Sequence, residues 1–395
     1  MRVRKSTGIF VLLLFFTGSG NKAFCNDSLI HQLLLRLDNI QAYHDPYFAP
    51  GVFPAYRKFV VNGRLNKDEN IFYSGIIALT LRRIRPQLSP ADQIICDTII
   101  NRVKLIAHKF KNRLGRETYN FGANDTVKPF FRSGPLTVFN GMMHVADDFD
   151  DTSIMQLVLD APDSVAAIVH SLMQQYTNKD GQLATTTLRG YKKYAAYSVW
   201  FGKKMLVELD ACVLCNTLYM VQHYNLRWTK ADSASLDFLL QIIKTKDYLN
   251  HANKLSVYYK TTPVIMFHLA RLMSVKPIPM LEALKPQLIA DAKEAYKKKD
   301  NLLEKIMLRT SLLHWGINMP AEKMAYTGNI INQLEGDDRF VFFIASASAT
   351  APKFLVYPLV ESGISRINFY CPAYNDCLML EYLAEQKKFN TAVQQ

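Results

Sequence analysis

The sequence lacks the short motifs that mark the commonest enzyme chemistries. Its 395 residues contain no Gly-x-Ser-x-Gly turn, no His-Glu-x-x-His pair, no P-loop and no Gly-rich dinucleotide turn. Each of those motifs positions a nucleophile, a metal ion or a phosphate through a fixed local geometry. Evidence for function must therefore come from other patterns in the chain.

Cysteine and tryptophan are also scarce, with six and three residues. So few cysteines exclude a disulfide-rich scaffold in a chain of this length. Cys371 and Cys377 are the pair best placed for a local disulfide. Cys212-x-x-Cys215 has the spacing of a redox motif, but it lies in an apolar helical stretch without a βαβ context. Three tryptophans are few for an open carbohydrate-binding cleft.

Long apolar runs are absent except at the N-terminus. Three basic residues there precede an apolar run at 8–18, and Ala23-Phe24-Cys25 is a plausible cleavage site. Eleven apolar residues are too short to span a bilayer comfortably, so we expect 1–25 to be a cleaved signal peptide. The protein is then expected to be exported, to the periplasm or the extracellular space, and contact with a membrane surface stays open.

The chain carries an excess of basic residues, with a formal net charge of +13. Removing residues 1–25 takes away four basic residues and no acidic ones, which leaves +9. A charge of this sign favours contact with an anionic surface or ligand. Nucleic acid is not an expected partner, because no nucleic-acid-binding motif is present and an exported protein rarely meets it.

The hydrophobic pattern has the helical period almost throughout. About twelve helices in six consecutive pairs are expected, at 28–41, 68–85, 90–113, 147–159, 164–176, 207–222, 231–244, 261–275, 280–297, 301–316, 321–334 and 373–388. Residues 47–61 are expected to form a loop. Two short runs, Phe340–Phe343 and Ile367–Tyr370, are β-leaning.

These elements predict an all-α fold with a small β-leaning segment near the C-terminus. No Pro- or Ser-rich linker divides the chain, so residues 26–395 are expected to be one domain. Six helical hairpins fit a closed (α/α)6 toroid. The alternative is an open helical solenoid, which the absence of a clean sequence repeat disfavours.

The most unusual stretch is Asp147-Asp148-Phe149-Asp150-Asp151-Thr152, which places four carboxyl groups where an apolar helix begins. Like charges this close cannot all ionise cheaply, so one carboxyl is expected to keep its proton near neutral pH. A neutral carboxylic acid is what general acid catalysis requires. The favourable N-terminal end of a helix explains one or two such residues rather than four. His144, one turn earlier, could orient one of the acids.

A second polar group interrupts an apolar helix at Asp210 and Asn216, which share one helical face. Polar side chains in such a helix must be hydrogen-bonded or must face a cavity. Asp210 is therefore a further catalytic candidate, and Asn216 a substrate-binding one. Aromatic residues could line a cavity that stabilises a cation. The aromatic candidates for substrate binding are Tyr119, Phe121, Tyr258 and Tyr259.

Asp148-Phe149-Asp150-Asp151-Thr152 resembles the Asp-x-Asp-Asp-Thr motif of class II terpene cyclases, and the helical pattern resembles prenyltransferase-like toroid proteins. The resemblance implies an isomerase or lyase without a cofactor. Asp150 would protonate an isoprenoid or other apolar substrate, with Asp148 and Asp151 tuning it. The chain departs from that family in three ways: it is long enough for only one toroid, it has no Gln/Trp repeats, and it carries an export signal. Because prenyl diphosphates are cytoplasmic, an exported enzyme would need another substrate, such as a hydrocarbon or alcohol reached from the membrane.

Three alternatives follow from the same residues. Asp147, Asp148 and Asp151 also fit an Asp-Asp-x-x-Asp motif, which would bind Mg²⁺ and a diphosphate, although no second metal motif is found. A carbohydrate-active toroid would pair Asp150 or Asp151 with Asp210 or Asp376 across a cleft. A non-catalytic binding toroid would use the acidic stretch to hold a structural cation or to cap its helix.

Overall fold

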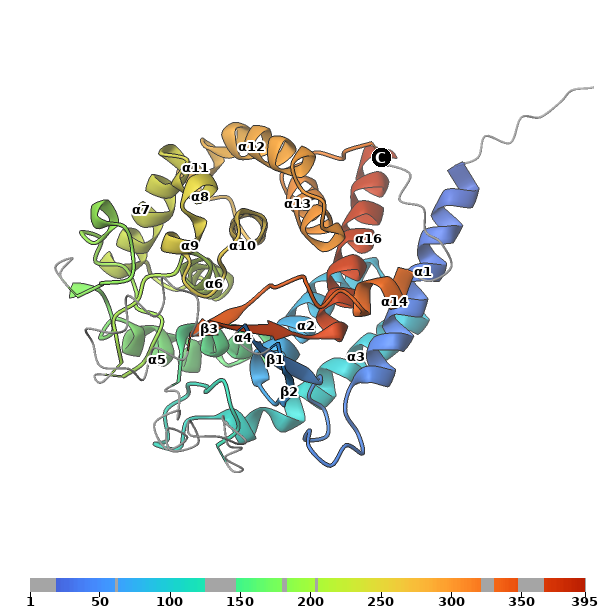
Figure 1. Ribbon diagram of the computed structural model, residues 1–395, viewed down its shortest axis with the longest axis horizontal. Helices are drawn as coiled ribbons and strands as arrows, with labels where there is room; N and C mark the ends of the chain where they lie inside the picture. The colour runs from blue at the N-terminus through green and yellow to red at the C-terminus, as the bar shows by residue number, and fades with distance from the viewer. Residues whose placement is uncertain are drawn as a thin grey trace, which may run out of the picture.

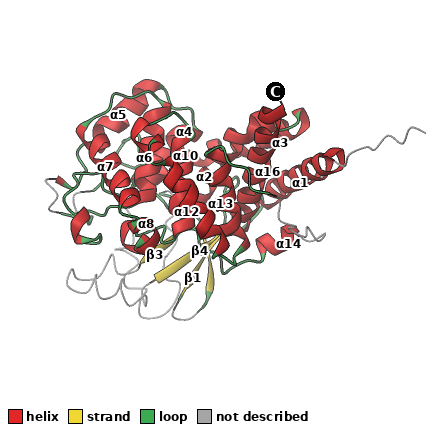
Figure 2. Cartoon of the chain, turned by 90° about the horizontal axis from the view of Figure 1, so that it is seen from above, coloured by secondary structure: helices red, strands yellow, loops and turns green. Residues whose placement is uncertain are grey.

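The computed structural model describes residues 19–60, 63–124, 147–179, 183–202, 205–320, 330–346 and 366–394. These residues are mostly helical and include one small antiparallel sheet (Figure 2), so the predicted predominance of helix is confirmed.

The longer helices are α1 (Ser19–Ile40), α2 (Ile71–Ile84), α3 (Pro90–Ile106), α4 (Phe149–Val158), α5 (Asp163–Met173), α6 (Ala211–His223), α7 (Lys230–Lys244), α10 (Thr262–Met273), α12 (Lys285–Lys297), α13 (Leu302–His314), α14 (Ile330–Glu335) and α16 (Pro372–Gln394). Each matches an expected helix. Residues 321–329, at the start of the expected 321–334 helix, lie outside the described residues. The short helices α8 (Asp247–Asn250), α9 (Ala252–Leu255) and α11 (Pro279–Glu282) connect longer ones.

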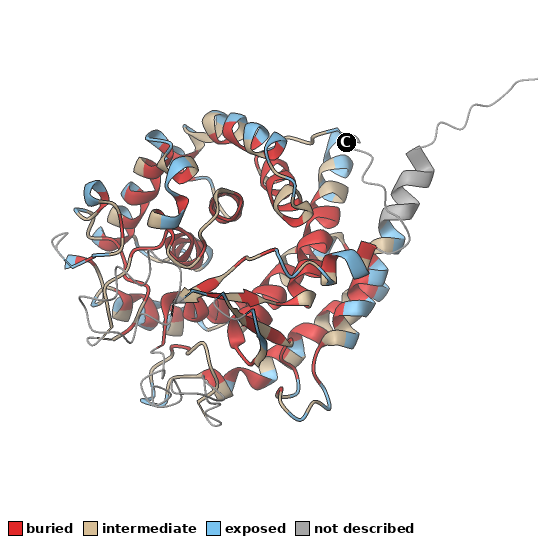
Figure 3. Ribbon diagram, viewed as in Figure 1, coloured by how far each residue is buried: buried red, intermediate tan, exposed pale blue. Residues whose placement is uncertain are grey.

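Six of the described helices contact one another in cyclic order: α2, α4, α6, α10, α13, α16 and α2 again. Figure 1 shows them surrounding a common centre. Other helices pack on their outer side, with α3 against α2, α7 against α6, α12 against α13, and both α1 and α14 against α16. The central helices are buried along most of their length, whereas the outer helices expose one side (Figure 3).

The central helices begin at one end of the molecule and finish at the other. Asp150, in the first turn of α4, contacts Asn216 of α6 and Tyr259, which precedes α10. Arg83, in the last turn of α2, contacts Ser274 at the end of α10 and His314 at the end of α13. Because Asp150 meets residues near the starts of α6 and α10, and the C-terminal ends of α2, α10 and α13 meet one another, these helices run in the same direction.

Polar caps fix where these helices begin. The side chains of Asn70, Asp148, Asp210 and Asn301 accept backbone N–H groups in the first turns of α2, α4, α6 and α13. Asn and Asp are favoured there because the first N–H groups of a helix have no partner within it.

The described sheet contains β1 (Ala55–Phe59), β2 (Leu65–Asp68), β3 (Ile344–Ser346) and β4 (Arg366–Tyr370), in the order β2-β1-β4-β3 with antiparallel neighbours. It lies on one side of the helical body (Figure 2). The strand β2 leads into α2 and β4 leads into α16, so the sheet adjoins the ends where those helices begin.

The sheet corrects two expectations. Residues 47–61 were predicted to be a loop, yet β1 lies within them. Its buried Arg57 forms an ion pair with Asp68 of β2 and interrupts the apolar pattern that would indicate a strand. The β-leaning prediction is confirmed for Ile367–Tyr370, but Phe340–Phe343 precede β3 and pack against helices instead.

The predicted Cys371–Cys377 disulfide is wrong, because both residues are free thiols, as are the other cysteines of the described residues. Cys371 directly precedes α16, and Cys377 lies within its first two turns. Residues 1–18 lie outside the described residues, and α1 begins within the predicted signal peptide, which stays a prediction. No described helix combines the length and apolarity needed to cross a bilayer.

Close packing of α2 on α4 depends on Gly75. A Cβ atom there would lie 3.0 Å from Cγ2 of Ile154 and 3.1 Å from Sδ of Met155. We predict that Gly75→Val lowers the free energy of unfolding by about 1–3 kcal/mol, because the added atoms force the helices apart. Urea denaturation measures the change. Gly190→Val is the control, since nothing lies within 4 Å of a Cβ at Gly190; equal stability of the two variants would contradict the prediction.

Candidate functional site

All four carboxyl groups of the acidic stretch are buried, with at most 6% of each residue exposed. Asp148 is the N-cap of α4 and its side chain accepts the backbone N–H of Asp151 at 2.7 Å. The helix-start interpretation therefore accounts for Asp148. It does not account for the other three, whose contacts differ from one another.

Asp147 is held by the loop that precedes the stretch. Its carboxylate accepts hydrogen bonds from Nη2 of Arg116, at 2.7 Å, and from the hydroxyl of Thr118. Burial raises the pKa of Asp147, while the Thr118 and Arg116 contacts oppose that shift. Since both oxygens are used, this residue anchors the loop, and its contacts give it no access to a substrate.

Asp148 and Asp151 form a close pair of buried carboxyl groups. Burial is the main reason that the pKa of Asp148 rises to about 7, and the nearby Asp150 raises it further. The pKa of Asp151 lies well above its ordinary value because of burial and of the adjacent Asp148. Two such groups cannot both ionise cheaply, so one proton is retained between them near neutral pH.

Asp150 is held by two neutral donors from other parts of the chain. Nδ2 of Asn216 donates to Oδ1 at 2.6 Å, and the hydroxyl of Tyr259 donates to Oδ2. Burial raises the pKa of Asp150 to about 6, against the lowering effect of these two hydrogen bonds. This carboxyl group can thus hold a proton near neutral pH and still be stabilised after losing it.

An aromatic cluster surrounds Tyr259, one of the two donors to this carboxyl group. The ring of Tyr259 lies 4.9 Å from that of His268 and 5.5 Å from that of Phe343, centre to centre. Phe343 also stacks on Phe121 at 5.7 Å and on Tyr258 at 6.1 Å. The structure therefore brings together three of the four aromatic residues predicted to bind substrate.

The fourth, Tyr119, acts through its backbone. Its carbonyl accepts the N–H of Asp148 at 3.2 Å, and its N–H donates to the hydroxyl of Thr152 at 3.0 Å. These bonds fasten the residue to the acidic stretch from both sides and explain the threonine that ends it. The contacts of the Tyr119 backbone position the stretch and do not build the aromatic cluster.

Asp210 has a comparable positioning role. As the N-cap of α6 it accepts the N–H groups of Cys212 and Val213, and it also accepts the hydroxyl of Ser256 at 2.6 Å and the N–H of Tyr258 at 2.8 Å. Four donors occupy its two oxygens, so it is not free to transfer a proton. The bond to Tyr258 places the adjacent tyrosine opposite Asp150. His144 lies outside the described residues.

The contacts of the acidic stretch do not support the Mg²⁺ alternative. Within the described ranges, no three His, Cys, Asp or Glu side chains are arranged so that they could hold a metal ion. Arg116 and Thr118 occupy the Asp147 oxygens, and Asp148 is engaged as a helix cap.

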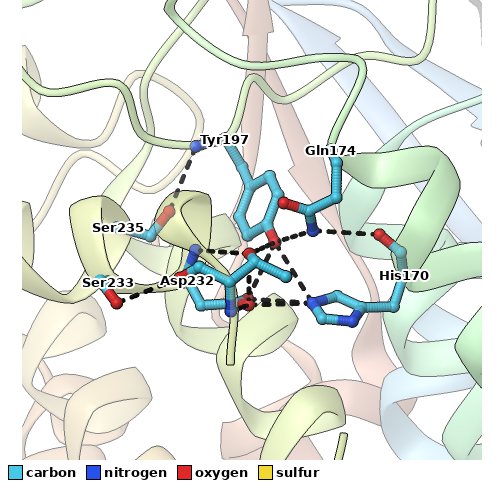
Figure 4. A network of polar contacts seen from close by, with 7 residues as sticks. His170, Gln174, Tyr197, Asp232, Ser233 and Ser235 are labelled. Atoms are coloured by element: carbon cyan, nitrogen blue, oxygen red, sulfur yellow. Dashed lines mark hydrogen bonds and ion pairs between the residues drawn. The ribbon is translucent and has the colours of Figure 1, made fainter. Parts of the chain in front are cut away.

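A buried polar network, shown in Figure 4, contacts the acidic stretch through Tyr197. Nε2 of His170, from α5, lies 3.0 Å from Oδ2 of Asp232 in α7, and the hydroxyl of Tyr197 donates to Oδ1 of Asp232 at 2.8 Å. The Tyr197 ring packs at 5.5 Å against Phe149, the neighbour of Asp150. The only sequence sign of this network is the capping box of Thr229 and Asp232.

Sequence reasoning missed several residues around Asp150. His268 and Phe342 pack on the ring of Tyr259, and the charge of Arg271 lowers the Asp150 pKa. The available signal was the apolar helix that carries His268 and Arg271, because a charged residue in such a helix needs a partner. Trp200 and Tyr258 both donate to Glu208, at 3.0 and 2.5 Å, which fixes the outer part of the aromatic cluster.

The raised pKa of Asp150 predicts a pH-dependent cost to folding. The folded protein binds this proton more tightly than the unfolded chain, so the contribution of Asp150 to stability falls as pH rises from about 4 to about 6 and is then constant. Asp150→Asn removes this effect. Relative to wild type, we expect the variant to gain on the order of 2 kcal/mol of unfolding free energy between pH 4 and 7. Urea denaturation across that range measures it.

Asp232→Asn is the matched control with the opposite sign. Burial raises the pKa of Asp232, but hydrogen bonds with His170 and Thr229 outweigh burial and hold this pKa below its ordinary value. Its contribution is present above the unfolded pKa and is lost as pH falls through the folded one. Relative to wild type, the unfolding free energy of Asp232→Asn should therefore be lowered more at neutral pH than at acid pH. A pH-independent difference between Asp150→Asn and wild type would rule out the Asp150 assignment.

No known family model, curated protein or solved structure matches this chain. The geometry around Asp150 is therefore the basis for assigning a function.

Proposed function

We propose that the chain is a single (α/α)6 toroid. Each central helix follows an outer one in sequence, in the pairs α1/α2, α3/α4, α5/α6, α7/α10, α12/α13 and α14/α16. The contact between α16 and α2 supports this proposal, because an open solenoid would keep its first and last repeats apart.

We further propose that the protein is a terpene-cyclase-like enzyme in which Asp150 is a general acid for an isoprenoid or other apolar substrate. The observation that carries the proposal is the buried Asp150 carboxyl, held by Asn216 and Tyr259 beneath aromatic rings, with a pKa of about 6. A carboxylic acid in an apolar site can give its proton to a carbon–carbon double bond.

The surrounding residues suit the two species that proton transfer creates. The Asp150 carboxylate left behind keeps its hydrogen bonds from Asn216 and Tyr259, which are stronger to an ionised acceptor. The faces of Tyr258, Tyr259 and Phe343 carry the negative part of the ring quadrupole and would stabilise a carbocation. The Asp148–Asp151 pair retains a proton nearby and limits loss of the Asp150 proton to other acceptors.

A glycosidase mechanism receives less support from the same geometry. It needs a second carboxyl group free to act on the opposite face of the sugar. Asp210 is fully occupied by four donors. Burial and then the charge of the nearby Glu335 raise the pKa of Asp376 to about 9. The predicted signal peptide at 1–25 adds two parts to this proposal: the protein is exported, and its substrate comes from a membrane.

The acid assignment predicts that Asp150→Asn abolishes turnover. Wild type and variant are incubated with extracted lipids and, separately, with glycans, and the products are compared by mass spectrometry. New products from lipid in wild type alone are the expected result. The control is Asp291→Asn, a second buried carboxylate that accepts a tyrosine hydroxyl, from Tyr248 at 2.8 Å, on outer helix α12. It should retain activity. Unchanged lipid products in Asp150→Asn would refute the assignment.

Tyr259 tunes the acid, so Tyr259→Phe should change the pH dependence of catalysis. Its hydrogen bond is the strongest influence that lowers the Asp150 pKa, and removing it raises that pKa. Since the protonated form is active, the loss of activity with rising pH should move to higher pH than in wild type. The pH–rate profile on the lipid substrate measures the shift. A profile displaced to lower pH would contradict this role.

A further inference from the structure

Arg271 is an arginine buried inside the ring of helices without a hydrogen-bond partner. It lies in the last turn of α10, is 1% exposed, and none of its three guanidinium nitrogens is hydrogen-bonded within the described residues. A buried charged donor left unpaired costs much more than one that is satisfied. The position therefore requires an explanation beyond packing.

The neighbouring helix α13 shows how this fold satisfies a buried arginine. Arg309 is 3% exposed, and it donates to the hydroxyls of Tyr382 and Tyr296, at 3.0 and 3.3 Å, and to two backbone carbonyls, at 2.8 and 3.0 Å. Arg271 has an equal degree of burial and none of these bonds. This difference indicates that the Arg271 guanidinium can donate further hydrogen bonds to a bound ligand.

One carboxylate partly balances the Arg271 charge. Oε2 of Glu381 lies 3.9 Å from Nη2, which is too long for a hydrogen bond. The other oxygen of Glu381 accepts Nη1 of Arg83 at 2.9 Å, and His314 lies 3.8 Å from it. Glu381 is therefore shared between two guanidinium groups, and its Oε2, which is unpartnered within the described residues, faces Arg271 across a gap too long for a hydrogen bond.

Other unpartnered polar atoms lie around the same guanidinium. The Tyr374 hydroxyl is close to it without good hydrogen-bond geometry within the described residues. Nε2 of His268 is also unpartnered there, and it is an acceptor, because Nδ1–H of the neutral ring donates to the carbonyl of Val264 at 2.8 Å. Apolar surface adjoins them, since the guanidinium lies 4.7 Å from the centre of the Phe267 ring and His268 stacks on Phe342. The surroundings thus combine the free donors of Arg271 and Tyr374 with aromatic walls.

We propose that Arg271 and the Tyr374 hydroxyl form an internal site for an oxyanion, a carboxylate or a phosphate, carried by a ligand whose apolar part lies among these aromatic side chains. A guanidinium presents paired N–H groups that match the two oxygens of such a group. The site does not depend on Asp150 acting as an acid, because its donors belong to other residues.

Binding of chosen probes to the full-length protein tests the site. Octanoate supplies the anion and an apolar chain, octanol supplies the chain alone, and inorganic phosphate supplies the anion alone. We expect octanoate to bind, by calorimetry and by a rise in melting temperature, at least about tenfold more tightly than octanol. Binding of phosphate as well would assign the site to free anions too. Failure of both anions to bind would mean that ordered water satisfies Arg271 and would overturn the proposal.

Variants locate the binding. Arg271→Gln should weaken octanoate about tenfold or more and leave octanol unchanged. Arg309→Gln, the matched buried arginine, should leave the octanoate affinity unchanged. If Arg271→Gln does not fold, Tyr374→Phe removes a single oxygen from the same site and should weaken octanoate severalfold. Equal octanoate affinity in wild type and in the folded variants would place the anion elsewhere and reject the site.

Discussion

The hydrogen bonds accepted by the Asp210 carboxylate fix the positions of the residues around Asp150. This carboxylate caps α6 and also binds Ser256 and the backbone of Tyr258, so one side chain fixes a helix start and the segment that leads into α10. Asn216 lies later on that helix, and Tyr259 follows directly in that segment. Both donors to Asp150 are thereby placed by a residue that does not touch it.

Burial of carboxyl groups carries a cost that the structure meets differently at each position. Asp147 has an arginine, Asp210 has four neutral donors, and Asp148 and Asp151 share a proton. Asp150 has two neutral donors, and among the described residues no cation lies within hydrogen-bonding distance of it. Such incomplete compensation is common where proteins keep a group reactive, and it distinguishes Asp150 from its neighbours more clearly than sequence position does.

The sequence was sufficient to predict most helices, because apolar residues recur at the helical period in each of them. It also predicted that Asn216 must be hydrogen-bonded or face a cavity, and the bond to Asp150 confirms this. The strand β1 was missed because its buried Arg57 finds its partner, Asp68, only after the chain folds. Likewise, Asp147 and Asp150 have the same local pattern, and only the distant Arg116 and Tyr259 separate their roles.

The first and last parts of the chain contact each other: β1 pairs with β4, and both α2 and α1 pack on α16. The chain must therefore bring together segments separated by some 300 residues before its centre is sealed. Such non-local contacts slow folding, because the loop must close before its contacts are gained. During synthesis, the last helix is made after all its partners, so the helices that pack on α16, which include α1, α2 and α13, keep one apolar side exposed to water until it docks.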